Sequence, residues 1–390
     1  MGKSTPIIAL FLVLVMLFSA CNVNVNIDEV NGGDVNVNVG VNTTPEVTTP
    51  AATTPAETTP EVTTPEVTTP EEPDPIPLEP ECAHVFTSRI VLTQVTTETD
   101  GEVANVCANC GGWQTETLAA VKSLKILAIG NSFSNNALKY LPILAKELGI
   151  EEVIIGKLYV GGCTVDGHWS RAESGADYES FQVNTTGDTN WTTYPAGQRS
   201  LNYALSLYDW DIITMQQGSP LSGMPTSLGN LQNLIDYVNA RKTNPNAKLY
   251  WHMTWAYSQF TEHNGFANYG KDQMTMYQAI VDLTKNCIVP NECFTGIIPA
   301  GTAVQNYRGK DINNASIEKD YITLPDGYHL RDYSEVLVAM TWLRTLTGLS
   351  LDAIKCNSHS DITFARTYLR SLKKSADNAY LNPYEVKSAY

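Results

Sequence analysis

The sequence predicts a three-layer α/β/α domain with a five-stranded parallel sheet, preceded by a disordered stalk and a small β module. Three observations support this prediction. Short apolar runs alternate with helical patterns over the last two thirds of the chain, Thr- and Pro-rich repeats lie near its start, and two Cys-containing motifs lie between these regions. Strands that alternate with helices imply βαβ units, and therefore a parallel sheet with helices on both faces.

Composition limits the class of protein. The chain has 390 residues, 25 Lys and Arg against 41 Asp and Glu, and a formal net charge of −16. Its hydrophobic fraction of 43% is that of an ordinary globular protein, so a sizeable core can form. The acidic balance argues against nucleic acid as a partner, because phosphate binding relies on Lys and Arg. No apolar run reaches the roughly 18–20 residues that span a bilayer, which argues against a polytopic membrane protein.

Residues 1–20 read as a lipoprotein signal peptide. Lys3 supplies a positive start, and a short apolar run follows at residues 6–18. Phe18-Ser19-Ala20-Cys21 resembles the lipobox of bacterial lipoproteins, in which the Cys thiol is lipidated. A plain secretory signal is the alternative. We therefore expect an exported chain, anchored to the extracellular face of the bacterial cell membrane by lipid on Cys21.

Residues 21–80 are predicted to form a disordered stalk. Asn and Val alternate over residues 22–42, and Thr-Thr-Pro-Glu-Val repeats fill residues 43–71. Pro recurs every few residues, so the backbone favours extended conformations and cannot build a helix or a strand ladder. Such a composition is typical of a semi-rigid spacer.

A small Cys/His module is expected at residues 81–120. It opens with Cys82-Ala83-His84 and closes with Cys107-Ala108-Asn109-Cys110, and between them residues 89–97 read as a strand followed by an Asp100-Gly101 turn. Cys82, His84, Cys107 and Cys110 together can hold one structural Zn²⁺. A Cys107–Cys110 disulfide and free thiols are the alternatives. The motif resembles short surface modules of Gram-positive bacteria.

The large domain is expected at residues 121–390. Its strands are predicted at residues 124–129, 152–158, 211–215, 248–253 and 295–298. Its helices are predicted at residues 137–148, 228–241, 272–285, 333–347 and 361–376. Residues 164–199 read as an irregular insert that can cover a site as a lid.

Ligands of an open parallel sheet bind at the carboxyl ends of its strands, so the residues after each strand are candidates for the site. They are Gly130-Asn131-Ser132 after the first strand, Gly161-Gly162-Cys163 after the second, Gln216-Gln217-Gly218-Ser219 after the third and Thr254-Trp255 after the fourth. Neither a Walker loop nor a Gly-x-Gly-x-x-Gly turn follows the first strand, which argues against nucleotide binding.

These residue types suit acyl transfer by a catalytic triad. A serine hydroxyl is a weak nucleophile until a His takes its proton, and a carboxylate fixes the tautomer of that His. Ser132 is the candidate nucleophile, His329 the general base and acid, and Asp326 the residue that orients His329. Asp326 and His329 lie three residues apart in one polar loop, so they can share one side of a turn. Ser132 as a helix cap is the competing interpretation.

An oxyanion hole must stabilise the charge on the carbonyl oxygen. We expect its donors to be the backbone N–H groups of Ser132 and Gly162 and the side-chain amide of Gln216 or Gln217. The alternative for the two Gln residues is that their side chains only form hydrogen bonds with buried backbone groups. Glycine lets a backbone N–H approach that oxygen closely.

In these stretches the chain resembles the SGNH (GDSL-like) serine hydrolases, within an uncharacterised SGNH-like branch. Gly130-Asn131-Ser132-Phe133-Ser134 matches the nucleophile block of that family, and Asp326-Gly327-Tyr328-His329 matches its Asp-x-x-His block. The resemblance implies an SGNH/flavodoxin-like fold and ester hydrolysis without a cofactor. The family usually has Gly-x-Asn-Asp after the third strand, with the Asn as an oxyanion donor, whereas this chain has Gln216-Gln217-Gly218-Ser219.

Aromatic residues suggest the substrate. Those in or beside the segments that leave the strands are Trp169, Trp191, Trp251, Trp255 and Tyr257. Aromatic rings pack against sugar rings, and acetylated glycans are common targets of the family that this chain resembles. We expect Asn131, Trp255 and His168 to line the cleft and Trp251 to pack in the core.

The remaining cysteines are assigned no role in the reaction. Cys163 is expected to be a buried small apolar residue rather than a second nucleophile, and Cys287 and Cys293 are close enough in the sequence for a disulfide.

Two functions remain open. The preferred one is a surface-tethered serine esterase that removes an O-acetyl group from a carbohydrate. The alternative is a non-catalytic glycan- or peptide-binding lipoprotein on the same fold, in which the altered third-strand block reflects lost activity. Reaction of Ser132 with a serine-directed probe distinguishes the two.

Overall fold

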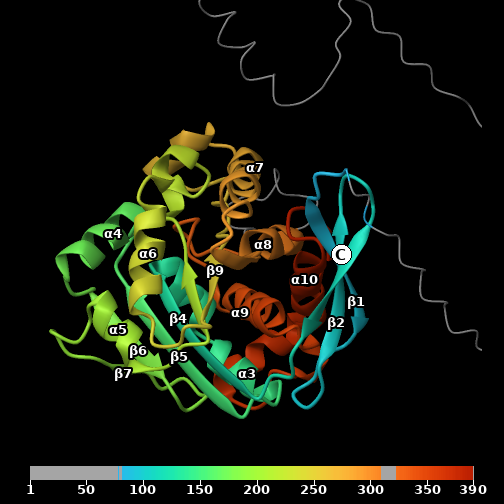
Figure 1. The fold of residues 1–390 in the computed structure, drawn as a ribbon, viewed down its shortest axis with the longest axis horizontal. Coiled ribbons are helices and arrows are strands. Elements are labelled where there is room, and N and C mark those ends of the chain that lie inside the picture. The colour runs from blue at the N-terminus through green and yellow to red at the C-terminus, as the bar shows by residue number, and fades with distance from the viewer. Residues whose placement is uncertain (1–77, 79–80, 309–321, 390) are drawn as a thin grey trace, which may run out of the picture. The chain divides into compact units, whose positions relative to one another are not determined.

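The computed structural model describes residues 78, 81–308 and 322–389 (Figure 1). The predicted signal peptide with Cys21, and the predicted stalk apart from Leu78, lie outside the described residues. In the part of the chain that the structure describes, no helix is both long enough and apolar enough to cross a bilayer.

The core of the large domain is a seven-stranded sheet in the order β10-β9-β8-β4-β5-β6-β7. Its first five strands are parallel and correspond to the five predicted ones. They are β4 (Ser123–Gly130), β5 (Glu152–Tyr159), β8 (Ile212–Met215), β9 (Lys248–His252) and β10 (Phe294–Ile298). The predicted α/β class with a parallel sheet is therefore confirmed.

Two antiparallel strands extend the sheet beyond the prediction. β6 (Ser180–Asn184) pairs with β5, and β7 (Thr192–Thr193) pairs with β6. They lie in the segment predicted to be an irregular lid, which also contains α4 (Val165–Ser174). The prediction that this segment is irregular was wrong, because β6 is only five residues long and buries Phe181 and Val183 between polar neighbours, a pattern too short to identify in isolation.

Helices cover both faces of the sheet. One layer contains α2 (Ser132–Leu138), α3 (Leu141–Glu147), α8 (Ala300–Arg308), α9 (Asp332–Thr347) and α10 (Leu369–Leu381). The other contains α4, α5 (Leu201–Leu207) and α6 (Leu231–Arg241). Figure 1 shows α9 and α10 on one side of the strands and α5 and α6 on the other. α7 (Gln273–Leu283) lies between β9 and β10 in the chain.

Short helical turns complete the domain. The 3₁₀ segments are η1 (Ser219–Leu221), η2 (Pro225–Leu228), η3 (Asn264–Tyr269), η5 (Leu351–Ala353) and η6 (Ser360–Tyr368), and η4 (Thr284–Ile288) is a π-helical turn. The helix predicted at 137–148 is two helices, because Pro142 lies in the first turn of α3 and lacks the N–H that a continuous helix requires.

The order of the parallel strands places a reversal of winding next to β4. From β4 the chain moves to β5 on one side and later to β8 on the other, so the direction of winding reverses between β4 and β8. Ligands of such sheets bind outside the carboxyl ends of the strands at this reversal. Ser132 follows β4 and Gln216 follows β8, so both lie at this position.

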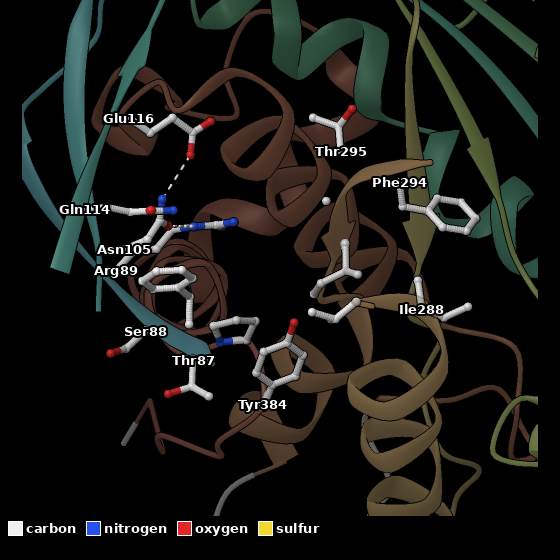
Figure 2. A pocket seen from close by; sticks show the side chains of 15 residues that line it. Thr87, Ser88, Arg89, Asn105, Gln114, Glu116, Ile288, Phe294, Thr295 and Tyr384 are labelled. Atoms are coloured by element: carbon white, nitrogen blue, oxygen red, sulfur yellow. Dashed lines mark hydrogen bonds between the residues drawn. The ribbon is translucent and has the colours of Figure 1, made fainter. Parts of the chain in front are cut away.

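The small module is a three-stranded antiparallel sheet of β1 (Phe86–Thr93), β2 (Gly101–Cys107) and β3 (Trp113–Leu118). It contacts the large domain through Gln94 Nε2, which donates to the Gly348 carbonyl at 2.7 Å. A cavity of about 360 Å³ separates the module from β10. Figure 2 shows Arg89 and Glu116 on the module side of this cavity and Thr295 on the opposite side.

Candidate active site

Ser132 occupies the first position of α2, directly after the turn that leaves β4. The residue before it, Asn131, has an extended backbone, and its Oδ1 accepts a hydrogen bond from the Phe133 N–H at 3.0 Å. Asn131 is therefore the helix cap, and the competing interpretation of Ser132 as the cap is wrong. Asn131 is also 2% exposed, so the prediction that it lines the cleft is wrong, whereas Ser132 is partly exposed.

Buried hydrogen bonds fix this turn to the neighbouring strand. Gln216, which follows β8, donates from Nε2 to Asn131 Oδ1 at 2.7 Å and accepts at Oε1 from Ser134 Oγ at 2.5 Å. The backbone of Gly130 passes so close to Ser134 that a Cβ there would overlap its hydroxyl. Glycine at position 130 is therefore required for Ser134 to reach Gln216.

The orientation of each amide in this network follows from the backbone. Asn131 Oδ1 accepts from the Phe133 N–H, and its Nδ2 donates to the Cys163 carbonyl at 3.0 Å. Gln216 must then present Nε2 to Asn131 and Oε1 to His252, whose Nδ1 lies 3.0 Å away. His252 therefore carries its proton on Nδ1. Burial lowers the pKa of His252 to about 3, so the ring is neutral.

Asp326 and His329 form the predicted pair. Asp326 Oδ2 lies 2.7 Å from His329 Nδ1, and Asp326 Oδ1 accepts the backbone N–H groups of Tyr328 and His329 at 2.9 and 3.0 Å. Burial alone would raise the pKa of Asp326, but these hydrogen bonds outweigh it and lower the pKa. Asp326 therefore stays ionised and holds Nδ1–H, which leaves His329 Nε2 as the ring nitrogen available to a substrate or nucleophile.

The loop that carries this pair is tightly held. Gly327 has a φ of +78°, and a Cβ there would lie 2.7 Å from the Thr261 Cβ. Thr261 Oγ1 donates to the Asp326 carbonyl at 2.8 Å, and the Ser258 N–H donates to the Gly327 carbonyl at 2.7 Å. Position 327 thus requires glycine both for its left-handed backbone and for its closeness to the neighbouring segment.

Contacts next to Ser132 bring α2 to the His329 loop. The Phe133 ring meets the edge of the His329 ring, with centroids 6.2 Å apart, and stacks on Trp255 at 4.1 Å. Trp255 Nε1 donates to the Tyr328 carbonyl at 2.8 Å. Residues far apart in the sequence therefore meet at one edge of the sheet, with Ser132 directly before Phe133.

Trp255 and His168 do not line a cleft. Trp255 is fully buried, and its contacts position Phe133 and the His329 loop instead. His168 is 1% exposed, its Nδ1 lies 3.1 Å from the Tyr178 hydroxyl, and burial lowers its pKa to about 3. Both predictions were wrong because sequence position does not show which way a side chain points.

The two Gln amides are engaged inside the protein. Gln217 donates from Nε2 to the carbonyl and the hydroxyl of Ser227, both at 2.9 Å, and its Oε1 accepts the N–H groups of Val165 and Gly218. It is 1% exposed, and Gln216 is 2% exposed. Neither amide is directed at an oxyanion, so the expected side-chain donor is corrected: both Gln residues hold the strand-end loops together, which is the alternative that the sequence left open for them.

Gly162 remains the backbone candidate from the second strand. It is exposed, has a φ of +62°, and has no atom within 4 Å of the position where a Cβ would lie. The neighbouring Cys163 is 7% exposed, and burial raises the pKa of its thiol to about 11. A protonated, buried thiol is a poor nucleophile, which agrees with the prediction for Cys163.

Sequence reasoning missed His252 and Ser134. His252 is the last residue of β9, and its Nδ1 contacts Gln216 Oε1. Ser134 lies two residues after Ser132, and its hydroxyl donates to the same oxygen. The signal available was the position of His252 at the carboxyl end of a predicted strand.

The Cys/His cluster of the module is assembled as predicted. The ligand atoms of Cys82, His84, Cys107 and Cys110 lie within 4.8 Å of one another. The Cys82–Cys107 sulfur distance is 3.9 Å, and Cys110 Sγ lies 3.8 Å from His84 Nδ1. Tetrahedral zinc with ordinary bond lengths requires edges of about 3.8 Å between two sulfurs and about 3.6 Å between sulfur and nitrogen. The cluster therefore fits a metal ion.

The described cysteines are all free. The disulfide alternatives for Cys107–Cys110 and for Cys287–Cys293 are therefore not what the structure contains. Free thiols remain compatible with metal binding, since thiolates are the ligands.

Comparison with known proteins identifies the family. A family model described as "Domain of unknown function (DUF4886)" matches residues 125–368. The crystal structure of a DUF4886 family protein from Bacteroides uniformis is 33% identical, with a TM-score of 0.59, and the match covers 68% of this chain and 98% of that one.

Two further solved structures are similar at a lower level. An α/β hydrolase enzyme from the metagenome of Lake Arreo is 12% identical over 58% of this chain and 95% of that chain, with a TM-score of 0.32. A catalytic mutant of an acetylxylan esterase from Geobacillus stearothermophilus is 10% identical over 57% of this chain and 93% of that one, with a TM-score of 0.34. Neither likeness bears on the activity of this chain. No curated protein matches the sequence. The chain belongs to the DUF4886 family.

Proposed function

We propose that the chain is a serine esterase of the SGNH type that removes an O-acetyl group from a carbohydrate. The observation that carries the proposal is the 2.7 Å Asp326–His329 pair at the edge of the sheet where α2 begins with Ser132. The motifs shared with SGNH hydrolases support the same assignment. The position at the reversal of winding between β4 and β8 supports it independently, because that is where α/β sheets bind ligands.

The reaction proceeds in two steps. Ser132 Oγ attacks the ester carbonyl while His329 Nε2 takes its proton, and Asp326 stabilises the imidazolium. The tetrahedral intermediate collapses, the bond to the sugar oxygen breaks, and His329 returns the proton to that oxygen. Water then attacks the acetyl–Ser132 ester while His329 takes its proton, the bond to Ser132 Oγ breaks, and His329 returns the proton to Ser132 as acetate leaves. No cofactor is needed.

In this proposal the oxyanion hole consists of the backbone N–H groups of Ser132 and Gly162. Open space around Gly162 leaves room for a carbonyl oxygen. One hydrogen-bond donor of such a hole contributes roughly 10²–10³ in rate. Because Gln216 and Gln217 do not supply a side-chain donor, we expect the rate to be low for a hydrolase of this kind.

The engaged Gln amides also favour the second candidate, a non-catalytic glycan- or peptide-binding protein. A fluorophosphonate probe and p-nitrophenyl acetate separate the two. The enzyme would be labelled and would release nitrophenol, and Ser132→Ala would lose both signals. Ser206→Ala, an exposed serine on α5, is the matched control and would keep both. An unlabelled chain that releases nitrophenol no faster than Ser132→Ala would refute the esterase.

We further propose that the module binds a structural Zn²⁺. Four protein ligands would close the coordination shell, so the metal would stabilise the fold rather than take part in the reaction. The proposed location of the protein is the outer face of a bacterial cell membrane, through lipid on Cys21. A Cys21→Ser chain released into the medium, with the parent chain retained on membranes, would support that location; equal release of both would contradict it.

A further inference from the structure

A cavity of about 580 Å³ lies beside the candidate active site, among α2, β5, α9 and η6. Two of its lining residues, Asn135 and Asn136, follow Ser132 by three and four positions on α2. Residues at that spacing lie on one face of a helix, roughly 5–6 Å apart. Asn136 Oδ1 also accepts the N–H of Leu330, the residue after His329, at 3.2 Å. The cavity is therefore one helical turn from the proposed nucleophile and is joined to the His329 loop.

Within the described residues, one of the two Lys side chains that line the cavity has no ion pair at salt-bridge distance. Lys139 binds both Asp332 and Glu335, with N–O distances of 2.6 and 2.7 Å. Among the described residues, the ammonium of Lys157 has no hydrogen-bond partner and lies 4.1 Å from the centroid of the Trp191 ring. Burial lowers the pKa of Lys157 to about 8, which reflects an ammonium with too few polar partners.

A second polar group in the cavity also lacks a partner. The side chain of Asn135 makes no hydrogen bond with the described residues, and its Oδ1 is buried. A buried carbonyl oxygen without a partner costs free energy, unlike Gln216 Oε1 and Asn131 Oδ1 in the same domain, which both accept hydrogen bonds. The buried Oδ1 is closed to a ligand, whereas the Asn135 Nδ2 can donate a hydrogen bond into the cavity.

Aromatic rings form the apolar part of the cavity. Trp191, Tyr140 and Phe364 line it, and the Tyr140 and Phe364 rings meet edge to face at 5.8 Å. Phe364 is 37% exposed, and Tyr368, one turn further along η6, is 45% exposed. Tyr368 lies outside the lining of the cavity, so Trp191, Tyr140 and Phe364 are the rings that can pack against the apolar face of a ligand.

The charges and polar groups select the class of ligand. Two Lys and three acidic residues line the cavity, so neither an anion nor a cation is favoured by the overall charge. Lys157 and the Asn135 Nδ2 can only donate, and the carboxylate of Asp361 can only accept. A hydroxyl group both donates and accepts, so a ring with several hydroxyls and an apolar C–H face satisfies the polar groups and the aromatic rings together.

We propose that this cavity binds a neutral sugar unit of the substrate, placed next to the unit whose ester reaches Ser132. The inference rests on the proposed function for its place in the reaction, but the binding of sugar there does not require hydrolysis. The cavity would thus supply the specificity that the small reaction centre lacks, since an acetyl ester by itself presents few groups to recognise.

The test measures sugar binding without turnover. The full chain with Ser132→Ala is titrated by calorimetry with cellotetraose, xylotetraose and tetra-N-acetylchitotetraose. We expect at least one of them to bind, and Trp191→Ala and Phe364→Ala to weaken that binding about ten-fold. Trp191→Phe, which keeps an aromatic face, is expected to restore most of it.

Tyr237→Ala is the matched control. Tyr237 lies on α6 in the opposite helical layer, and its ring holds the Arg241 guanidinium at 3.7 Å as Trp191 holds Lys157. It is expected to leave binding unchanged. Absence of binding by all three sugars, or equal binding by Trp191→Ala and its parent, would overturn the cavity proposal.

Hydrolysis of p-nitrophenyl acetate by the chain with Ser132 intact separates this proposal from the esterase, because that ester carries no sugar. A chain that binds a tetrasaccharide but hydrolyses no ester refutes the esterase and supports the cavity. A chain that hydrolyses the small ester but binds no sugar supports the esterase and refutes the cavity proposal.

Discussion

Gln216→Glu tests the buried network beneath Ser132, because it replaces one donor by one acceptor and changes almost nothing in shape. In the native protein Gln216 Nε2 donates to Asn131 Oδ1 across 2.7 Å, and Asn131 Oδ1 cannot turn away because it caps α2. An ionised carboxylate at position 216 would face that oxygen at the same distance. The neutral acid can instead donate its proton to Asn131 and keep its other oxygen for Ser134 and His252.

The size of the effect follows from linkage. Burial and the facing acceptor raise the pKa of the introduced carboxyl group in the folded state above its unfolded value of about 4.3. The variant is therefore as stable as the parent below about pH 4, and it loses stability as the pH rises toward the folded pKa. A folded pKa near 7 corresponds to a loss of roughly 3–4 kcal/mol at pH 8. His252 stays neutral throughout, because burial lowers its pKa to about 3.

Urea unfolding of parent and variant at pH 4 and pH 8 measures this difference. Gln217→Glu is the matched control. Its carboxylate would face the Ser227 carbonyl, but it would keep two backbone N–H donors and could accept from the Ser227 hydroxyl, so a weaker pH dependence is expected. A Gln216→Glu variant that is equally destabilised at both pH values, or stable at pH 8, would refute the assigned amide orientation. We also expect the Gln216→Glu variant to hydrolyse esters more slowly at pH 8, because the buried hydrogen bonds of Gln216 are lost at that pH.

Three further predictions concern other parts of the molecule. Asp326→Asn should lower kcat for ester hydrolysis by roughly 10²–10⁴-fold with little change in KM, because His329 loses the partner that fixes its tautomer; a pre-steady-state assay with p-nitrophenyl acetate checks this, and an unchanged rate would count against the triad. Cys107→Ser should abolish stoichiometric zinc in the purified chain and lower the melting temperature of the module, as measured by metal analysis and calorimetry, while Cys293→Ser on the exposed surface should do neither. The pKa of Lys157 is lower in the folded than in the unfolded chain, so the parent chain should gain stability between about pH 8 and pH 10.4 as the ammonium loses its proton. Lys157→Met should remove this gain. If the free energy of unfolding changed equally with pH in parent and variant, the assignment would be contradicted.

The parallel part of the sheet could be predicted because each of its strands is a short apolar run with a turn signal behind it. β4 is the clearest case: residues 126–129 are buried on both faces of the sheet, and the run stands out in the sequence. β7 could not be predicted in this way, because its two residues, Thr192 and Thr193, are exposed and owe their conformation to pairing with β6.

The triad loop was predictable and its surroundings were not. Asp326 and His329 are three residues apart, so their contact is local and follows from the turn. The contact between Gln216 and Asn131 joins two separate strand ends, and the sequence offers no measure of which amide end faces which partner. Trp255 shows the same limit, because the sequence does not reveal whether a Trp side chain is buried and supports a loop or is exposed and available to a sugar.

The last strand of the sheet has one side without a neighbour. β10 is an end strand in the described sheet, and β1 of the module faces it across the cavity of Figure 2. Exposed strand borders recruit other chains and lead to aggregation. The module faces this unpaired side of β10, so unfolding of the module would leave that strand open to pairing with other chains.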